Sequence, residues 1–282
     1  MLNTISKMKG YMAIDNYLEK HLAKSAFDSA VKDGEPAIKV IRRGDKTQTP
    51  HTITFVFSPW QSGEVMQTWI MKQVPRKSIT YSISPTSLLL EDPVATSEVC
   101  LRVCEEAVEF VHKAIQNDNY VKSIRIIGLS VGTGVAAYVA NKLYKRVKIT
   151  TVDLVCPGAE LSTALWHGSR TSSLRSEYES RGFTLEDIQK MWSKVDLINN
   201  LNFATEVSVR VSYSKGDRVI IPEQTKKVIE RIKSLSPGKV VVKENYFLGH
   251  YLTMFWVWLN WRTVYRYSFP KPNKKPLRSQ RS

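Results

Sequence analysis

Apolar residues recur along the chain in two alternating spacings. Short runs of β-branched and aromatic residues, such as residues 51–57 (HTITFVF), predict strands, whereas residues 97–116 carry apolar side chains at helical spacing. The predicted strands cover residues 37–41, 51–57, 78–83, 123–129, 148–155, 207–213 and 239–242. The predicted helices cover residues 11–33, 63–73, 97–116, 131–143, 222–235 and 252–263. This alternation indicates the α/β class: a mostly parallel central sheet with helices on both faces.

One stretch interrupts the alternation. Residues 159–206 are irregular and largely polar, with one clear helix predicted at residues 184–194. Thr184 and Asp187 have the spacing of a capping box at its start. We expect this insertion to form a cap over a substrate pocket. Five apolar side chains within it are the candidates for lining that pocket: Leu161, Leu165, Trp166, Phe183 and Met191.

A G-x-S-x-G pattern, the sequence GLSVG, lies between the predicted strand at 123–129 and the predicted helix that follows. Such a sharp strand-to-helix turn lifts the serine, Ser130, above the sheet and directs the next N–H, that of Val131, at a reacting carbonyl. Side chains at Gly128 and Gly132 would collide in this strained turn, so glycine is needed at both positions. Ser130 is therefore the candidate nucleophile.

The candidate acid, Asp217, lies in the turn after the predicted strand at 207–213, within SKGDRVIIP. A carboxylate at this place would hold the tautomer of a histidine and stabilise its imidazolium form. Asp153, inside a predicted strand, and Glu160, just after that strand, stay open as alternatives.

The candidate base is His250, because it follows the last predicted strand and precedes the last predicted helix. The glycine before it, Gly249, suits a loop that bends the imidazole toward Ser130. The remaining histidines are His21, His51, His112 and His167; the last lies in the insertion, where it could contact substrate.

The second donor to an oxyanion is expected in the loop after residues 51–57. Pro59 has no N–H, so the main-chain amide of Trp60 is the candidate. With Val131, Trp60 would complete the oxyanion hole.

The motifs GLSVG, SKGDRVIIP and LGHY, in this order, resemble the α/β-hydrolase superfamily over residues 37–267, without indicating a subfamily. The resemblance implies an α/β-hydrolase fold, a small helical cap inserted after the sixth strand, and neither a metal nor an organic cofactor. Ser58 and Pro59 replace the His-Gly that is usual in this superfamily, and the N-terminal helix is not part of its core pattern. The superfamily also includes members without activity.

The length of 282 residues and the hydrophobic content of 43% suit one large domain, or at most two smaller ones. We expect an N-terminal helical extension at 1–36, the α/β-hydrolase domain at 37–269 with its cap at 159–206, and a basic tail at 270–282. The formal net charge of +15 favours anionic partners, including weak contact of the tail with an anionic membrane surface, although such a charge also serves solubility alone. No nucleic-acid motif accompanies it, so no specific nucleic acid is expected.

The three cysteines have no metal-ligand spacing and are expected to be buried free thiols in a reducing compartment. The start of the chain lacks an ordinary secretory signal, and no run reaches the ~18 apolar residues of a membrane span. We therefore expect a cytoplasmic protein that is peripheral to a membrane at most. The last segment mixes tryptophans with basic residues, which suits either an interfacial membrane contact or packing of the final helix on the sheet.

These observations favour an acyl hydrolase that cleaves a small carboxylic ester or thioester through an acyl-enzyme on Ser130, Asp217 and His250. An acyltransferase with the same triad is one alternative. A catalytically silent binding protein is the other.

Overall fold

The computed structural model describes residues 36–45, 49, 51–59, 67–68, 70–71, 79–85, 88–169 and 171–260. Within these residues a seven-stranded sheet has the order β1-β3-β2-β4-β5-β6-β7, and only the β1–β3 pair is antiparallel. The strands are β1 (Ile38–Arg43), β2 (His51–Phe57), β3 (Thr80–Pro85), β4 (Val121–Leu129), β5 (Ile149–Val155), β6 (Ser208–Ser214) and β7 (Val240–Asn245). The mostly parallel sheet predicted from the sequence is thereby confirmed.

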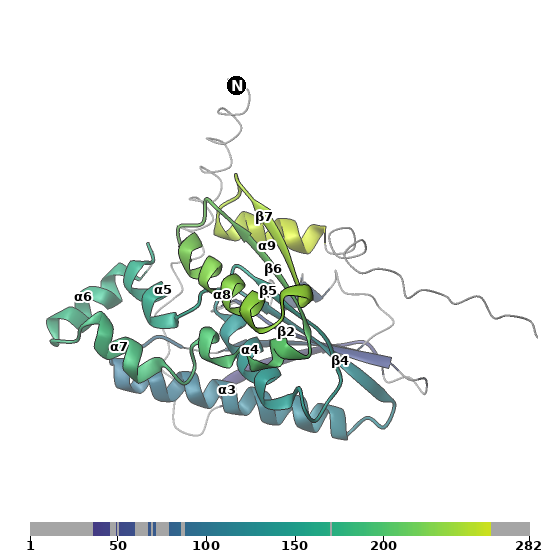
Figure 1. Cartoon of the computed structure of the whole chain (residues 1–282). Helices are drawn as coiled ribbons and strands as arrows, with labels where there is room; N and C mark the ends of the chain where they lie inside the picture. The colour runs from purple at the N-terminus through teal and green to yellow at the C-terminus, as the bar shows by residue number, and fades with distance from the viewer. Residues whose placement is uncertain are drawn as a thin grey trace, which may run out of the picture.

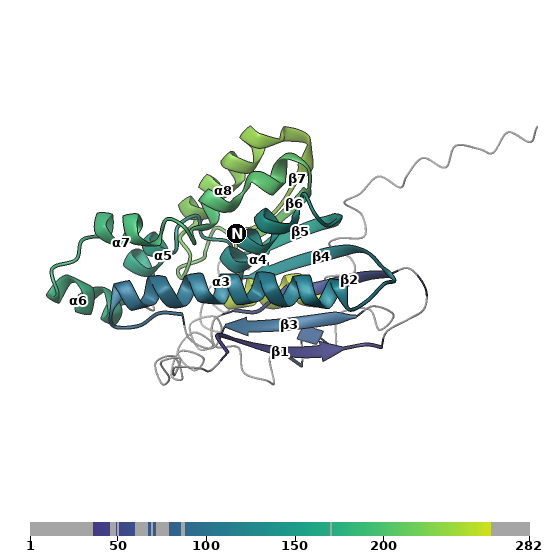
Figure 2. The same cartoon turned by 90° about the horizontal axis from the view of Figure 1, so that it is seen from below.

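Two hydrophobic clusters show that helices cover both faces of the sheet. On one face, Ile126 of β4 shares a core with side chains of α3 (Pro93–Gln116), α4 (Gly132–Leu143) and α8 (Pro222–Leu235). On the other face, Ile127 shares a smaller cluster with residues of α9 (His250–Leu259). The two isoleucines point to opposite faces because successive side chains of a strand alternate. Figures 1 and 2 show α3, α4 and α8 on one side of the sheet and α9 on the other.

The predicted helix at 97–116 begins earlier, at Pro93, because the sequence before it provides a cap. The side chain of Asp92 accepts the N–H of Val94 at 2.7 Å, and Pro93 occupies the first helical position. Both features favour helix initiation.

The insertion between β5 and β6 contains three helices, α5 (Leu161–His167), α6 (Ser172–Ser180) and α7 (Leu185–Trp192). Two short 3₁₀ turns, η2 (Leu197–Asn200) and η3 (Asn202–Thr205), complete it, and a third, η4 (Pro237–Lys239), precedes β7. The capping box of α7 is present: Thr184 N–H donates to the Asp187 carboxylate at 2.9 Å, and Asp187 N–H donates to the Thr184 hydroxyl at 3.3 Å.

The place of the insertion in the strand order differs from the expectation. The resemblance implied a cap after the sixth strand, whereas among the described strands the insertion follows the fifth, β5. The hydrophobic pattern predicts five strands before residue 159, and these are the five observed. The expectation of a sixth strand before the insertion came from the resemblance and not from this chain's own pattern.

Several expectations fall outside the described residues. The predicted helix at 11–33, the N-terminal extension and the basic tail are among them. The predicted helix at 63–73 is described only at 67–68 and 70–71, which are helical. No helix of the described residues is both long and apolar enough to cross a bilayer.

Candidate active site

Ser130 occupies a sharp turn between β4 and α4. Its φ of 53° is in the left-handed region that L residues seldom adopt. Its N–H donates to the Val155 carbonyl of the neighbouring strand at 2.9 Å, and its own carbonyl accepts the N–H of Thr133 at 2.9 Å. The turn is therefore held from the sheet on one side and from the first turn of α4 on the other.

The two glycines that flank the serine are required by close packing. A Cβ atom on Gly128 would lie 2.6 Å from Cα of Thr133. A Cβ atom on Gly132 would lie 2.6 Å from the carbonyl oxygen of Ser58, and closer still to that of Phe57 at the end of β2. No side chain fits at either position, which agrees with the reason given for these glycines from the sequence.

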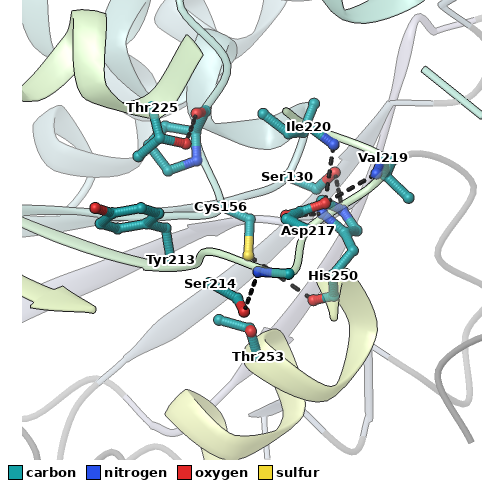
Figure 3. A network of polar contacts seen from close by, with 12 residues as sticks. Ser130, Cys156, Tyr213, Ser214, Asp217, Val219, Ile220, Thr225, His250 and Thr253 are labelled. Carbon is teal, nitrogen blue, oxygen red and sulfur yellow. Dashed lines mark hydrogen bonds and ion pairs between the residues drawn. The ribbon is translucent and has the colours of Figure 1, made fainter. Parts of the chain in front are cut away.

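The side chains of Ser130, His250 and Asp217 form one continuous chain of hydrogen bonds (Figure 3). His250 Nε2 lies 2.8 Å from Ser130 Oγ, and His250 Nδ1 lies 2.7 Å from Asp217 Oδ2. Because an ionised carboxylate only accepts, Nδ1 carries the proton, and Nε2 is left to accept the hydroxyl proton of Ser130. The three residues lie far apart in the sequence and meet at the carboxyl ends of β4, β6 and β7.

Local hydrogen bonds hold the acid in place. Asp217 Oδ1 accepts the N–H groups of Val219 and Ile220, each at 2.9 Å. The turn that carries Asp217 is fixed by Gly216 N–H, which donates to Ser214 Oγ at 3.1 Å. One carboxylate oxygen is thus committed to the main chain, and the other is presented to the imidazole.

The loop that carries the histidine is fixed by Asn245, the last residue of β7. Its side chain donates to Thr253 Oγ1 at 3.1 Å and accepts the N–H of Leu248 at 3.1 Å. Because His250 is the first residue of α9, this link between strand, loop and helix sets the position of the imidazole.

No protein-family model matches the chain, and no curated protein matches it in sequence. Solved structures do match. Carboxyl esterase 2 from the mycorrhizal fungus Tuber melanosporum is 12% identical, with a TM-score of 0.53 over 88% of this chain and 91% of that one. MGS-M2, an alpha/beta hydrolase enzyme from a Medee basin deep-sea metagenome library, is 10% identical, with a TM-score of 0.51 over 84% and 96%. Acetyl Xylan Esterase 1 from Thermoanaerobacterium sp. JW/SL YS485 is 11% identical, with a TM-score of 0.51 over 79% and 78%.

The chain has the α/β-hydrolase fold. At such identities the matches establish the architecture and not the reaction. The chemistry of this α/β-hydrolase fold is therefore inferred from its own side chains, Ser130, His250 and Asp217.

The two alternative acids are engaged elsewhere. Asp153 lies inside β5, has no exposed surface and pairs with the guanidinium groups of Arg210 and Arg125. Glu160 accepts the hydroxyl proton of Thr163 at 2.5 Å.

None of the other described histidines has a recorded contact with Ser130. His51 is in β2 and pairs with Asp118 at 3.1 Å, His112 is on α3, and His167 ends α5 with an exposed side chain. His21 lies outside the described residues.

Of the two expected oxyanion donors, the structure describes one. Val131 directly follows Ser130 at the start of α4, where aligned peptide dipoles favour negative charge. No acceptor is recorded for its N–H within the described part of the chain. Trp60 lies outside the described residues.

The five pocket candidates contact the large hydrophobic core. Leu165 is buried within it, and the four partly buried members pack against it: Leu161, Trp166, Phe183 and Met191. The helix α5, which carries three of the five, ends beside the loop of the acid, since Ser169 N lies 3.5 Å from the carbonyl oxygen of Arg218. The insertion therefore adjoins the site. That its five apolar side chains line a substrate pocket remains a prediction.

A residue that the sequence analysis did not single out, Cys156, lies beside the site. It follows β5, is fully buried, and has a φ of 53°, equal to that of Ser130. Its Sγ lies 3.8 Å from the carbonyl oxygen of His250. None of the three cysteines is in a disulfide and all are buried, as expected, but nothing in the local sequence distinguishes Cys156 from the others.

Potential metal ligands of Cys156, Asp217 and His250 lie within 4.8 Å of one another. Two of these groups, however, already hydrogen-bond to each other, since Asp217 Oδ2 faces His250 Nδ1. The remaining ring nitrogen of His250 faces Ser130. The donor set is thus arranged for proton transfer to and from the serine hydroxyl.

Proposed function

We propose that this protein is a serine hydrolase that cleaves carboxylic esters or thioesters through an acyl-enzyme on Ser130. The observation that supports the proposal best is the hydrogen-bond chain from the Ser130 hydroxyl through the imidazole of His250 to the Asp217 carboxylate. A hydroxyl is a weak nucleophile at neutral pH, and a hydrogen-bonded base corrects this weakness. The two matched enzymes that are named as esterases have the same fold as this protein.

In the proposed reaction, Ser130 Oγ attacks the acyl carbon while its proton moves to His250 Nε2. Asp217 holds the Nδ1–H and stabilises the imidazolium that forms. The imidazolium then gives its proton to the departing alcohol or thiol, which leaves an ester between the acyl group and Ser130. Water, deprotonated by the same imidazole, attacks this ester and restores the free serine.

Charge that develops on the acyl oxygen needs donors. We propose the main-chain N–H groups of Val131 and Trp60 for this role. For Val131, the proposal rests on its place after the nucleophile at the first turn of α4. We also propose that the insertion at 159–206 forms a cap whose apolar side chains bind the acyl chain. Replacing Trp166 or Met191 should then change the rate on long acyl chains more than on acetate.

A fluorophosphonate probe on the purified full chain tests the proposal. The wild-type protein should be labelled covalently, and Ser130→Ala should not be. Ser234→Ala, which removes an exposed hydroxyl on α8, is the matched control and should be labelled as the wild type is. A wild-type protein that takes up no probe, or a Ser130→Ala variant that is labelled equally, contradicts the assignment.

A panel of nitrophenyl esters and acyl thioesters of graded length then defines the substrate class. Hydrolysis of neither series by a protein that reacts with the probe would favour transfer to an alcohol or thiol acceptor. Adding such acceptors to the assay would test that reaction directly.

A further inference from the structure

The exposed large apolar side chains of the described residues are concentrated in one short stretch of the sequence. Of the seven within the described residues, two are isolated, Val94 and Tyr120. The other five lie within residues 246–259: Tyr246 (57% exposed), Phe247 (44%), Phe255 (47%), Trp256 (38%) and Leu259 (54%). Scattered exposed apolar residues need no explanation, but a concentration of large ones marks an interaction surface. We call these five residues the aromatic face.

The helix α9 has two different sides. Its inner side is buried against the sheet and includes Met254, Val257 and Trp258. At 3.6 residues per turn, Phe255, Trp256 and Leu259 lie within an arc of about 100° on the opposite side. In Figure 1, α9 lies on the side of the sheet away from α3, and it contacts β6 and β5.

Of the two interpretations of this segment from the sequence, packing of the final helix on the sheet applies to Trp258. Trp258 packs in the interior and its indole N–H donates to the carbonyl of Ile70 at 3.1 Å. Trp256, two residues earlier, faces outward. Packing on the sheet accounts for one tryptophan but leaves the other unexplained.

The sequence that follows the aromatic face is strongly positive. From residue 245 to residue 282 the sequence contains seven Lys or Arg residues and no Asp or Glu. The described residues Arg218 and Lys243, which are close in sequence to Asp217 and to the aromatic face, are exposed as well. The adjacent acid, Glu244, is neutralised by an ion pair with Lys215 at 2.5 Å. Such a charge complements an anionic surface.

We propose that the aromatic face docks on the surface of an anionic phospholipid bilayer. Tryptophan, tyrosine and phenylalanine beside basic residues suit the level of the lipid headgroups, where apolar burial and charge attraction act together. With ten residues, α9 is about 15 Å long, half the ~30 Å of a hydrocarbon core, so it lies along the surface.

Docking through α9 would bring the bilayer close to the candidate active site, because the first residue of this helix is His250. Lipid-dissolved esters would then be within reach of Ser130. Docking itself does not require the proposed hydrolysis, so the two proposals fail separately.

Sedimentation with vesicles tests the proposal. The purified full chain is mixed with vesicles of phosphatidylcholine, with or without about one third phosphatidylserine, in 0.1 M salt. We expect the wild type to bind the anionic vesicles and to bind pure phosphatidylcholine weakly. The variant Phe255→Ser/Trp256→Ser/Leu259→Ser should lose affinity for anionic vesicles on the order of tenfold or more, because it removes three exposed apolar side chains and no charge.

Tyr120→Ser is the matched control, since Tyr120 is similarly exposed (45%) but lies before β4 and is not part of the aromatic face. It should bind as the wild type does. Labelling of Ser130 by the fluorophosphonate probe and the thermal melt check that each variant is folded. Full binding by the triple variant would assign the contact to basic residues alone and overturn the proposal. A wild type that does not bind anionic vesicles, or one that is dimeric while the triple variant is monomeric, would also overturn it.

Discussion

Two described residues other than glycine, Ser130 and Cys156, have a left-handed backbone, and they are neighbours in space. Each directly follows a central strand, β4 or β5, and Ser130 N–H donates to the residue before Cys156. A left-handed residue with a side chain costs roughly 1–2 kcal/mol, so such conformations persist only where the surroundings fix them. One of the two is the candidate nucleophile and the other lies beside it. Backbone strain of this kind concentrates at active sites.

The role proposed for Asp217 predicts a separation of rate from stability. In Asp217→Asn, the amide oxygen can still accept the N–H groups of Val219 and Ile220, so the turn should keep its shape. The amide nitrogen, however, would face His250 Nδ1 as a donor and favour the wrong tautomer. Turnover of a good ester should fall on the order of 10⁴-fold, with little change in Tm.

Turnover and thermal melts of Asp217→Asn are compared with those of Asp187→Asn, an exposed carboxylate in the α7 capping box. The control should keep its turnover. A near-wild-type rate for Asp217→Asn would move the role to Glu160 or another carboxylate.

At the scale of elements, the elbow depends on close contact between the start of α4 and the end of β2. Gly132→Ala should therefore force these elements apart, because its Cβ would collide with the carbonyl oxygens of Phe57 and Ser58. We expect a loss of ~1–3 kcal/mol in the free energy of unfolding, as for overpacking elsewhere, and a strong loss of activity. Denaturant unfolding and ester turnover measure the two effects.

Gly134→Ala is the matched control on the same helix. Its Cβ would meet only the Val195 carbonyl oxygen, at an ordinary 3.7 Å, so the higher helix propensity of alanine should stabilise the chain by roughly 0.5–1 kcal/mol. Equal destabilisation by both substitutions would show that the elbow does not need the close approach at Gly132.

The insertion has a pH-sensitive attachment at Asp196. Its side chain accepts the N–H of Leu161, the first residue of α5, at 2.8 Å. Burial raises the pKa of Asp196 from 3.8 to about 7, against the opposing effect of this hydrogen bond, and the charge of Glu160 adds to the rise.

Between about pH 4 and pH 7, the folded chain therefore holds more protons at Asp196 than the unfolded chain does. The free energy of unfolding should fall by up to ~1.4 kcal/mol per pH unit as pH rises through this window. Above it, Asp196 is ionised in both states, and the stabilisation that its protonated form provides is lost. In Asp196→Asn, the amide oxygen can still accept from Leu161 and carries no charge. Unfolding at pH 5 and pH 8 should show a smaller pH dependence for the variant; an unchanged dependence would place the titrating group elsewhere.

The sequence predicted most elements because their burial follows a simple period. The central strands β2, β4 and β5 are nearly buried throughout, and α3 buries one face at regular helical spacing. Of the three short helices of the insertion, α7 was predicted, whereas α5 and α6 were not. In α6, SSLRSEYES, only Leu174 and Tyr178 are buried, which is too sparse for a helical pattern.

The three candidate triad residues could be named from the sequence for a related reason. Each follows a predicted strand, and their order along the chain, serine then acid then histidine, was sufficient to select them. Cys156 was not found, since its importance comes from a neighbour 94 residues away, His250. The insertion's place after the fifth strand could have been read from the chain's own pattern, but the resemblance suggested the sixth.

At the scale of the whole molecule, a buried ion cluster links three adjacent strands. Asp153 of β5 pairs with Arg210 of β6, at 2.7 Å through Nη2 and also through Nε, and with Arg125 of β4 at 3.0 Å. Asp153 and Arg210 are almost completely buried. Buried charges of this kind need their partners, because an isolated one is poorly solvated inside the protein.

Arg210→Met should lower the free energy of unfolding by about 3–5 kcal/mol, because Asp153 would lose its buried partner. Denaturant unfolding measures the change. Lys113→Met, which breaks an exposed pair with Glu109 on α3, is the control and should have a much smaller effect. Equal effects of the two substitutions would mean that Arg125 alone compensates Asp153.

The burial of Cys156 makes this thiol an internal reporter of local opening. A water-soluble disulfide reagent can reach it only when the ends of β5 and α9 separate, so its labelling rate measures how often the site opens. Cys100 and Cys104 on α3 report on a distant region, and burial raises the pKa of Cys100 to about 12, which slows its reaction further. Phosphonylation of Ser130 should slow the labelling of Cys156 while leaving that of Cys104 unchanged, as mass spectrometry of the labelled peptides would show. Equal slowing at both thiols would mean that the molecule opens only as a whole, and that the site has no independent motion of its own.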